Sequence, residues 1–277
     1  MGQNISADEY NIFRQFLQDA CGIVLGDNKQ YLVSSRLRKV AQDEGLNDVG
    51  ELIRTLNSKP FSTFKERVVD AMTTNETLWF RDVHPFDILK NRLLPEFVKE
   101  NRGKQLRIWS AASSSGQEAY SISMSIDEFK RSNMGGLSGG EKITGTDISP
   151  SMLEMARSGH YDPLSLGRGL SEERKRVFFD HDKDGHWYVK PQIKQRADFR
   201  QLNLQDSFGA LGKFDIVFCR NVLIYFSAEF KADILTRIHA TLNPGGYLFL
   251  GSTEALSGLP DLYEMIQCRP GILYRAK

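Results

Sequence analysis

The segment LRIWSAASSSGQEAYSISMSIDEFKR, residues 106–131, decides the fold class. Residues 106–111 form a short apolar run of the kind found in buried strands, and residues 113–116 supply small side chains for a turn. Apolar side chains then recur at helical spacing over residues 117–131. A strand, a small-residue turn and a helix in this order indicate the first half of a βαβ unit.

The same alternation continues toward the C-terminus. A second strand is predicted over residues 142–147, and Ser149-Pro150 supplies the cap and first turn of a helix. The remaining predicted elements are a strand at 214–219, a helix at 228–242, an Asn-Pro-Gly-Gly turn at 243–246 and a strand at 247–251. Strands that alternate with helices predict an α/β domain with a mostly parallel sheet.

The first third of the chain has a different pattern. Ser6 and Glu9 form a capping box before a helix at 10–21, and further helices are predicted at 30–44, 49–57 and 61–72. Strand-like alternation is absent before about residue 104. We therefore expect an all-α N-terminal domain over residues 1–85 and an α/β domain over residues 86–277.

Residues 161–198 interrupt the alternation inside the second domain. A short helix at 171–178 precedes the run Asp180 to Gly185, which has strand-like residues on both sides. The spacing of its aspartates imitates the start of a calcium loop, but the twelfth position is Pro191 instead of glutamate. The segment therefore predicts an inserted subdomain built on a β-hairpin.

Composition excludes several classes of protein. The 277 residues carry a formal net charge of +1, without the basic excess typical of nucleic-acid binders. The three cysteines form no CxxC pair and the five histidines show no ligand spacing, so no metal site is expected. The N-terminus has no apolar signal core, and no apolar run approaches a membrane span. These features predict a cytoplasmic protein without membrane insertion.

Polar side chains follow four of the predicted strands. They are the small-residue turn at 113–116, Asp147, Asn203-Leu204, and the run at 220–222. Ligands of open parallel sheets bind outside the carboxyl ends of the strands, and a carboxylate there suits a ribose diol. Asp147 alone is more simply interpreted as a helix cap, and the asparagines as turn residues.

Three longer motifs carry a resemblance to a known family. They are TTNETLWFR at 73–81, RIWSAA with GQE at 107–118, and FDIVFCRNVLIYF at 214–226. Together they closely resemble the CheR family of chemotaxis receptor methyltransferases, over nearly the whole chain. The resemblance implies a Rossmann-like class I methyltransferase sheet with an all-α N-terminal domain and a β-hairpin insertion. It also implies S-adenosylmethionine as cofactor and S-adenosylhomocysteine as product.

The resemblance assigns roles to individual positions. Arg81 and Tyr225 correspond to the catalytic positions facing methyl transfer, and Arg36, Arg38 and Lys39 to a basic helix that binds receptors. Glu118 corresponds to the carboxylate that holds the amino group of the cofactor. The full set of implied cofactor-binding positions is Asn75, Thr77, Arg81, Glu118, Asp147, Asn203, Leu204, Asn221 and Val222. One departure is Ala119, where the family often has proline.

The implied reaction is esterification of glutamate side chains on methyl-accepting chemotaxis receptors by a monomeric enzyme. A glutamate with a pKa of about 4.3 is ionised near pH 7 and needs no general base. Two alternatives remain. A nucleic-acid methyltransferase would bind its substrate with the basic helix. The chain lacks, however, the Asp/Asn-Pro-Pro-Tyr motif that binds an amine and the Pro-Cys motif that supplies a nucleophile. A receptor adaptor would keep the fold without activity. The compact turn of the insertion favours a subdomain that does not tether a receptor peptide.

Overall fold

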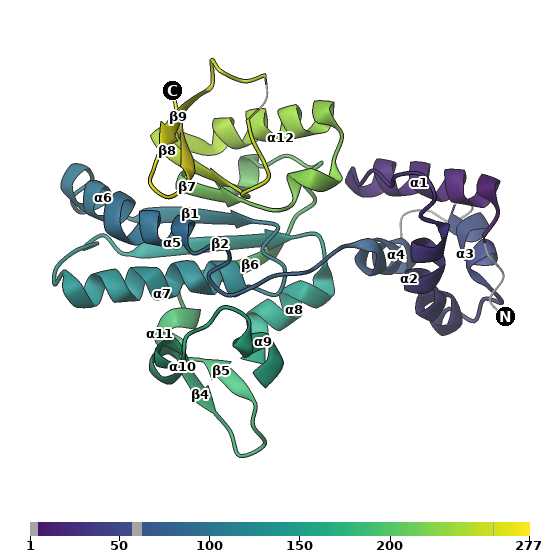
Figure 1. Cartoon of the computed structure of the whole chain (residues 1–277), viewed down its shortest axis with the longest axis horizontal. Helices are drawn as coiled ribbons and strands as arrows, with labels where there is room; N and C mark the ends of the chain where they lie inside the picture. Colours follow the sequence, from purple (N-terminus) through teal and green to yellow (C-terminus); the bar gives the residue numbers. More distant parts are fainter. Residues whose placement is uncertain (1–4, 57–62, 257) are drawn as a thin grey trace.

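The computed structural model describes residues 5–56, 63–256 and 258–277. A cluster of helices from the N-terminal part stands at one end of a sheet-containing domain (Figure 1). The described residues that precede Leu106 contain no strand, as the sequence predicts. The all-α segment is thus followed by an α/β domain.

The N-terminal helices pack around their own apolar core. Their bounds are α1 Ala7–Cys21, α2 Gln30–Asp43, α3 Val49–Leu56 and α4 Thr63–Met72. Ser6 caps α1 and exchanges the predicted capping-box hydrogen bonds with Glu9. The core is built from side chains such as Phe13, Leu37 and Leu52, each fully buried. The four predicted helices are confirmed, except that Asn57 and residues 61–62 lie outside the described residues.

The second domain contains a seven-stranded sheet with the order β6-β2-β1-β7-β8-β10-β9. The first five strands in this order are parallel, and β10 pairs antiparallel with both of its neighbours. The bounds are β1 Leu106–Ala111, β2 Glu141–Asp147, β6 Ala197–Gln201, β7 Phe214–Cys219, β8 Leu242–Leu250, β9 Tyr263–Gln267 and β10 Ile272–Ala276. This confirms the predicted α/β class with its mostly parallel sheet.

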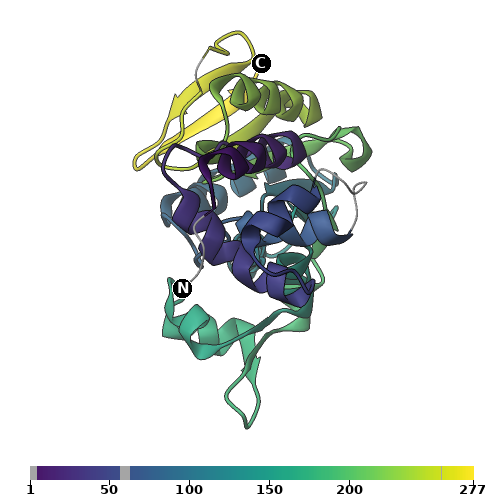
Figure 2. The same cartoon turned by 90° about the vertical axis from the view of Figure 1, so that its right-hand side faces the viewer.

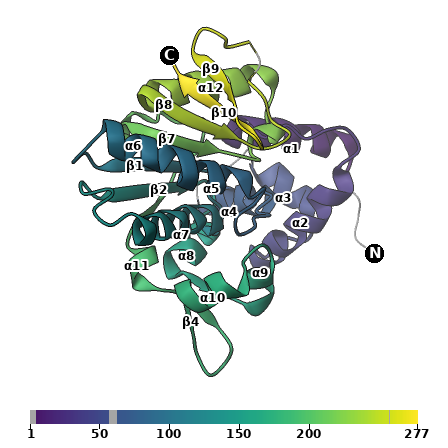
Figure 3. The same ribbon diagram turned by 60° about the vertical axis from the view of Figure 1, so that its left-hand side comes forward.

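Both faces of the sheet are buried by helices (Figure 3). Ile108 packs into the cluster on one face, and the next residue, Trp109, into the cluster on the other. The first face is covered by α5 His84–Ile88, the π-helical turn η1 Leu89–Leu93, α6 Leu94–Glu100, α7 Gln117–Ser132 and α8 Pro150–Ser158, and the second by α12 Ala228–Thr241. A strand buried on two faces reads as a continuous apolar run, which is the pattern of residues 106–111.

The insertion forms a small sheet with the order β3-β5-β4. Its elements are β3 His160–Tyr161, α9 Pro163–Gly167, α10 Glu172–Phe178, β4 Phe179–His181, β5 Trp187–Val189 and α11 Pro191–Lys194. Strands β4 and β5 pair antiparallel, and their hairpin projects from the domain (Figure 1). Asp182 closes the turn by accepting the backbone N–H groups of Asp184 and His186. The predicted hairpin is confirmed.

Two features of the C-terminal part differ from the prediction. The Asn-Pro-Gly-Gly run is not a turn that precedes a strand, because β8 begins at Leu242 and continues through it. Leu242 pairs with Phe214 and Tyr247 with Ile216, so the run is an irregularity inside the ladder. The antiparallel pair β9–β10 was not predicted. Strand β9 lies at the edge of the sheet with only Tyr263 buried, so it lacks the apolar run that marks the central strands.

Candidate cofactor and methyl-transfer site

A pocket lies where the N-terminal helices meet the carboxyl ends of β1, β2, β6 and β7. Strand order reverses between β1 and β7, which is the switch point where open α/β sheets bind ligands. The cavity measures about 210 Å³. Figure 2 shows the N-terminal helices standing in front of these strand ends. Helices α1 and α2 and the loop between them contribute Cys21, Ile23, Val24, Leu25, Leu32 and Arg36 to the lining.

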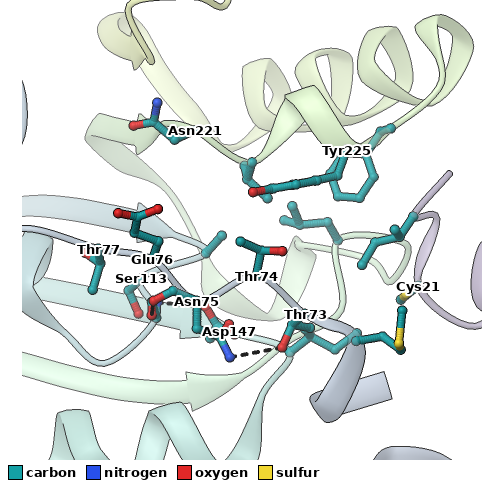
Figure 4. A pocket seen from close by; sticks show the side chains of 18 of the residues that line it. Cys21, Thr73, Thr74, Asn75, Glu76, Thr77, Ser113, Asp147, Asn221 and Tyr225 are labelled. Atoms are coloured by element: carbon teal, nitrogen blue, oxygen red, sulfur yellow. Dashed lines mark hydrogen bonds between the residues drawn. The ribbon is translucent and has the colours of Figure 1, made fainter. Parts of the chain in front are cut away.

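The segment that joins the two domains forms one wall of the pocket. Asn75 donates from Nδ2 to Oγ1 of Thr73 at 3.0 Å, the contact drawn as a dashed line in Figure 4. The backbone carbonyl of Asn75 accepts from Oγ of Ser114 at 3.0 Å. Arg36 donates from Nη1 to the carbonyls of Met72 at 2.6 Å and Thr73 at 3.0 Å. The linker is therefore fixed by side chains of both domains.

The loop after β1 brings backbone close to the cavity. Ala112 and Ser114 have φ of 54° and 48°, in the left-handed region that non-glycine residues rarely occupy. Such strain is concentrated at functional sites. The buried hydroxyl of Ser113 lines the pocket and has no hydrogen-bond partner among the described residues. A buried polar group without a partner is costly, so this hydroxyl indicates a ligand that satisfies it.

Asp147 ends β2 and faces the pocket with both carboxylate oxygens engaged by backbone. Oδ2 accepts from the N–H of Ser114 at 2.7 Å, and Oδ1 from that of Ser149 at 2.9 Å. Burial raises the pKa of Asp147, and these N–H groups act in the opposite direction. The side-chain cap of α8 is Ser149, whose Oγ accepts from Met152. Asp147 is thus a pocket residue, and the simpler interpretation as the helix cap is wrong.

The loop after β7 is held by Glu254, which the sequence did not single out. Oε2 of Glu254 accepts from the N–H groups of Asn221 and Gly251, both at 2.7 Å, and Oε1 from that of Leu223 at 2.8 Å. Asn221 has a φ of 59°. This loop carries Val222 and leads into the 3-10 turn η3 Leu223–Tyr225. The carboxylate keeps a strained backbone in place beside the cavity.

Arg220 is a second residue that sequence reasoning left without a role. Its side chain is 1% exposed and donates from Nη1 to Oε2 of Glu118 at 2.8 Å. Nη2 reaches Oδ2 of Asp82 at 2.7 Å and the carbonyl of Arg81 at 2.8 Å. The position after a strand was visible in the sequence, but its carboxylate partners are far away along the chain. Their pairing is a property of the tertiary structure.

The structure brings together most of the predicted site residues. Arg36 and all of the implied catalytic and cofactor-binding positions line the pocket: Asn75, Thr77, Arg81, Glu118, Asp147, Asn203, Leu204, Asn221, Val222 and Tyr225. The amide of Asn203 is used between the domains, where Nδ2 donates to the carbonyl of Ala20 at 2.8 Å. Arg38 and Lys39 are exposed and outside the lining. Of the three basic residues predicted to bind receptors, only Arg36 therefore faces the pocket.

Ionisable groups of the pocket lining are largely paired. Glu118 binds Arg220, and Glu76 lies 2.7 Å from Arg168. Burial raises the pKa of the Cys21 thiol to about 11. No histidine lines the pocket within the part of the chain that the structure describes. The site thus offers little to deprotonate a neutral nucleophile at pH 7 and suits an acceptor that arrives ionised.

Within residues 5–56, 63–256 and 258–277, no group of three or more His, Cys, Asp or Glu side chains is placed to hold a metal ion. Each helix in these ranges is too short or too polar to cross a membrane.

The sheet order, the pocket at the switch point and the acidic residue ending β2 are typical of doubly wound proteins that bind a nucleoside-containing cofactor. The matching family profile narrows this class to S-adenosylmethionine-dependent methyltransferases. The profile described as "CheR methyltransferase, SAM binding domain" matches residues 75–272, and "CheR methyltransferase, all-alpha domain" matches residues 8–73. The chain therefore belongs to the CheR methyltransferase family.

Similar proteins agree with this assignment. The chain is 60% identical over 269 residues to chemotaxis protein methyltransferase Cher2 of Pseudomonas putida, covering 97% of this chain and 98% of the relative. It is 61% identical to chemotaxis protein methyltransferase 1 of Pseudomonas aeruginosa, with the same coverage. The chemotaxis protein methyltransferase of Escherichia coli is 33% identical over 94% of this chain and 89% of its own length. The family profile and these relatives together place the chain among methyltransferases that use S-adenosylmethionine.

Proposed function

We propose that the protein transfers a methyl group from S-adenosylmethionine to the side-chain carboxylate of glutamates on methyl-accepting chemotaxis receptors. The products are a glutamyl methyl ester and S-adenosylhomocysteine. The observation that carries the proposal is the paired state of the ionisable groups around the pocket, since a carboxylate acceptor needs no base. An amine or hydroxyl acceptor would need one. The names of the relatives, chemotaxis protein methyltransferases, support receptors as the source of this carboxylate.

The residues present fit the cofactor. We assign the ribose hydroxyls to Asp147, whose carboxylate lines the cavity with acceptor capacity beyond its two backbone contacts. We assign the α-ammonium group to Glu118 and a polar contact to the unpartnered hydroxyl of Ser113. Asn203, Leu204, Asn221 and Val222 complete the assignment, together with Asn75 and Thr77.

The bound cofactor supplies an electrophilic methyl group on a sulfonium. The chain's contribution is to hold the acceptor in line and to exclude water. Arg81, whose Nη1 donates to the carbonyl of Glu76 at 3.2 Å, places a guanidinium at the lining to attract a carboxylate. Tyr225 lies on the opposite side of the cavity from the linker residues (Figure 4). Charge disappears as the carboxylate attacks, so a dry site favours the transition state.

The N-terminal domain is the proposed docking surface for acidic receptor helices. Arg38 and Lys39 project from α2 into solvent, and the same helix reaches the pocket through Arg36. A receptor segment bound along α2 would therefore lie beside the cavity that holds the methyl donor. Arg14, on α1, is paired with Asp27 at 2.9 Å. In this proposal the enzyme works as a monomer in the cytoplasm, where the receptor helices are.

The test is transfer of radiolabelled methyl from S-adenosylmethionine to purified receptor cytoplasmic fragments. The expected result is label that base releases as methanol, lost in the Arg81→Ala variant. Arg200→Ala, which removes a partly exposed arginine paired with Asp198, is the matched control and should keep full activity. Label on nucleic acid instead of receptor would replace the proposal with the first alternative. Cofactor binding without any labelling would favour an inactive adaptor.

A further inference from the structure

A buried guanidinium joins two carboxylates beside the cofactor pocket. Arg220 contacts Oε2 of Glu118 at 2.8 Å and Oδ2 of Asp82 at 2.7 Å. The side chain of Glu118 is 13% exposed and that of Asp82 is 27% exposed. The other oxygen of Glu118, Oε1, accepts from Oγ of Ser110 at 2.8 Å. These contacts fix the direction in which the Glu118 carboxylate presents its remaining lone pairs.

The cluster carries an unbalanced charge. Two carboxylates and one guanidinium leave one net negative charge. Glu118 and Arg220 line the pocket, whereas Asp82 lies outside the lining and is partly exposed, so Glu118 presents the negative charge to the cavity while Asp82 pairs with Arg220 from the solvent side. A ligand with one positive charge beside Glu118 would balance the net charge of the cluster. If Asp82 were neutral, the pair of Glu118 and Arg220 would cancel and the attraction for a cation would weaken.

The same guanidinium also holds a strained turn. Phe80, Asp82 and Val83 have φ of 48°, 67° and 54°, all in the left-handed region. Nη2 of Arg220 binds the carbonyl of Arg81, in the middle of this turn, at 2.8 Å. Backbone in this conformation persists only where its surroundings over-determine it. Arg220 thus links the carboxylate of Glu118 to the segment from which the side chain of Arg81 projects.

We propose that Asp82 and Arg220 are positioning residues for the ammonium group of the cofactor. Arg220 aims Glu118, and Asp82 supplies the negative charge that Arg220 would otherwise cancel. The inference rests on the assignment of Glu118 under the proposed function, and it concerns binding of the cofactor alone. Asp82 does not touch the ligand and acts on it through Arg220 and Glu118. Its charge is therefore expected to favour ligands that carry an ammonium group over those that lack one.

The test compares two ligands by isothermal titration calorimetry on the full chain. One is S-adenosylhomocysteine, and the other is its deamino analogue, which lacks only the ammonium group. Asp82→Asn should raise Kd for S-adenosylhomocysteine by about tenfold and Kd for the analogue by less than about twofold. Arg220→Lys keeps the positive charge but has a single nitrogen to donate hydrogen bonds. It should reduce the difference in affinity between the two ligands and also lower the affinity for both. Melting temperatures establish that each variant folds.

Glu118→Gln is the reference variant, because it removes the proposed direct contact. The preference is the ratio of the affinity for S-adenosylhomocysteine to that for the deamino analogue. If Glu118→Gln loses this preference but Asp82→Asn keeps it, the inference is overturned and the proposed site stays intact. An equal loss for both ligands in Asp82→Asn would mean that Asp82 only supports the backbone, which also overturns it. A preference retained in Glu118→Gln would remove the ammonium assignment and this inference together, without bearing on which acceptor is methylated.

Discussion

Replacement of Asp147 by asparagine separates its two roles, in the fold and in ligand binding. The carboxylate is 6% exposed and accepts the N–H groups of Ser114 at 2.7 Å and Ser149 at 2.9 Å. Asparagine keeps one oxygen, so one of these donors would face an NH₂ group. Loss of a hydrogen bond to a charged acceptor costs about 1.5–3 kcal/mol. For a chain of this size we expect the melting temperature to fall by about 4–10 °C.

The effect on the cofactor follows from the same carboxylate. The proposed ribose contacts need a hydrogen-bond acceptor at position 147. The single amide oxygen of asparagine cannot accept from both backbone N–H groups and from the ribose hydroxyls as well. A loss of about 1.5–3 kcal/mol in binding corresponds to a rise of about 10- to 150-fold in Kd. Calorimetric titration with S-adenosylhomocysteine measures Kd, and differential scanning calorimetry measures the melting temperature.

Asp162→Asn is the matched control for this pair of measurements. Asp162 caps α9 by accepting from the N–H of Ser165 at 2.8 Å, and it does not line the pocket. Asparagine caps helices about as well as aspartate, so this control should keep most of its stability and all of its affinity for the cofactor. If Asp147→Asn lowers the melting temperature but changes Kd by less than about threefold, the ribose assignment is refuted.

Two further predictions concern other parts of the chain. Reversal of charge in Arg38→Glu with Lys39→Glu should lower the rate of receptor methylation at least several-fold and leave Kd for the cofactor unchanged; an unchanged rate would remove α2 from receptor docking. Burial opposes ionisation of Glu128, but hydrogen bonds from Arg174 and Lys90 outweigh it and lower the pKa below 4.5. The stability that the ion pairs of Glu128 with Arg174 and Lys90 contribute is therefore present above pH 4.5 and lost as pH falls through the lowered pKa of Glu128. Glu128→Gln should cost about 1–2 kcal/mol at pH 7, and unfolding curves recorded at decreasing pH should show this difference from wild type disappear below the lowered pKa of Glu128.

Much of the fold follows from local sequence. The run at 106–111 and the helix after it were predicted with their observed starts because apolar periodicity and small-residue turns are local signals. The same holds for the capping box of Ser6 and Glu9. The Asn-Pro-Gly-Gly run was misassigned, because pairing with β7 keeps the chain in the sheet on both sides of it. Long-range pairing overrides a local turn preference.

The sequence by itself determined the α/β class, the helical N-terminal domain and the hairpin insertion. Through its motifs it also indicated a set of residues that line the pocket. Tertiary structure alone decided how those residues are connected. It set Arg36 against the linker carbonyls, away from Arg38 and Lys39. It also placed Arg220 between Glu118 and Asp82, which lie 102 and 138 positions away along the chain. Such contacts carry no local signal, because the free energy of a buried ion pair depends on partners that only the folded chain brings within hydrogen-bonding distance.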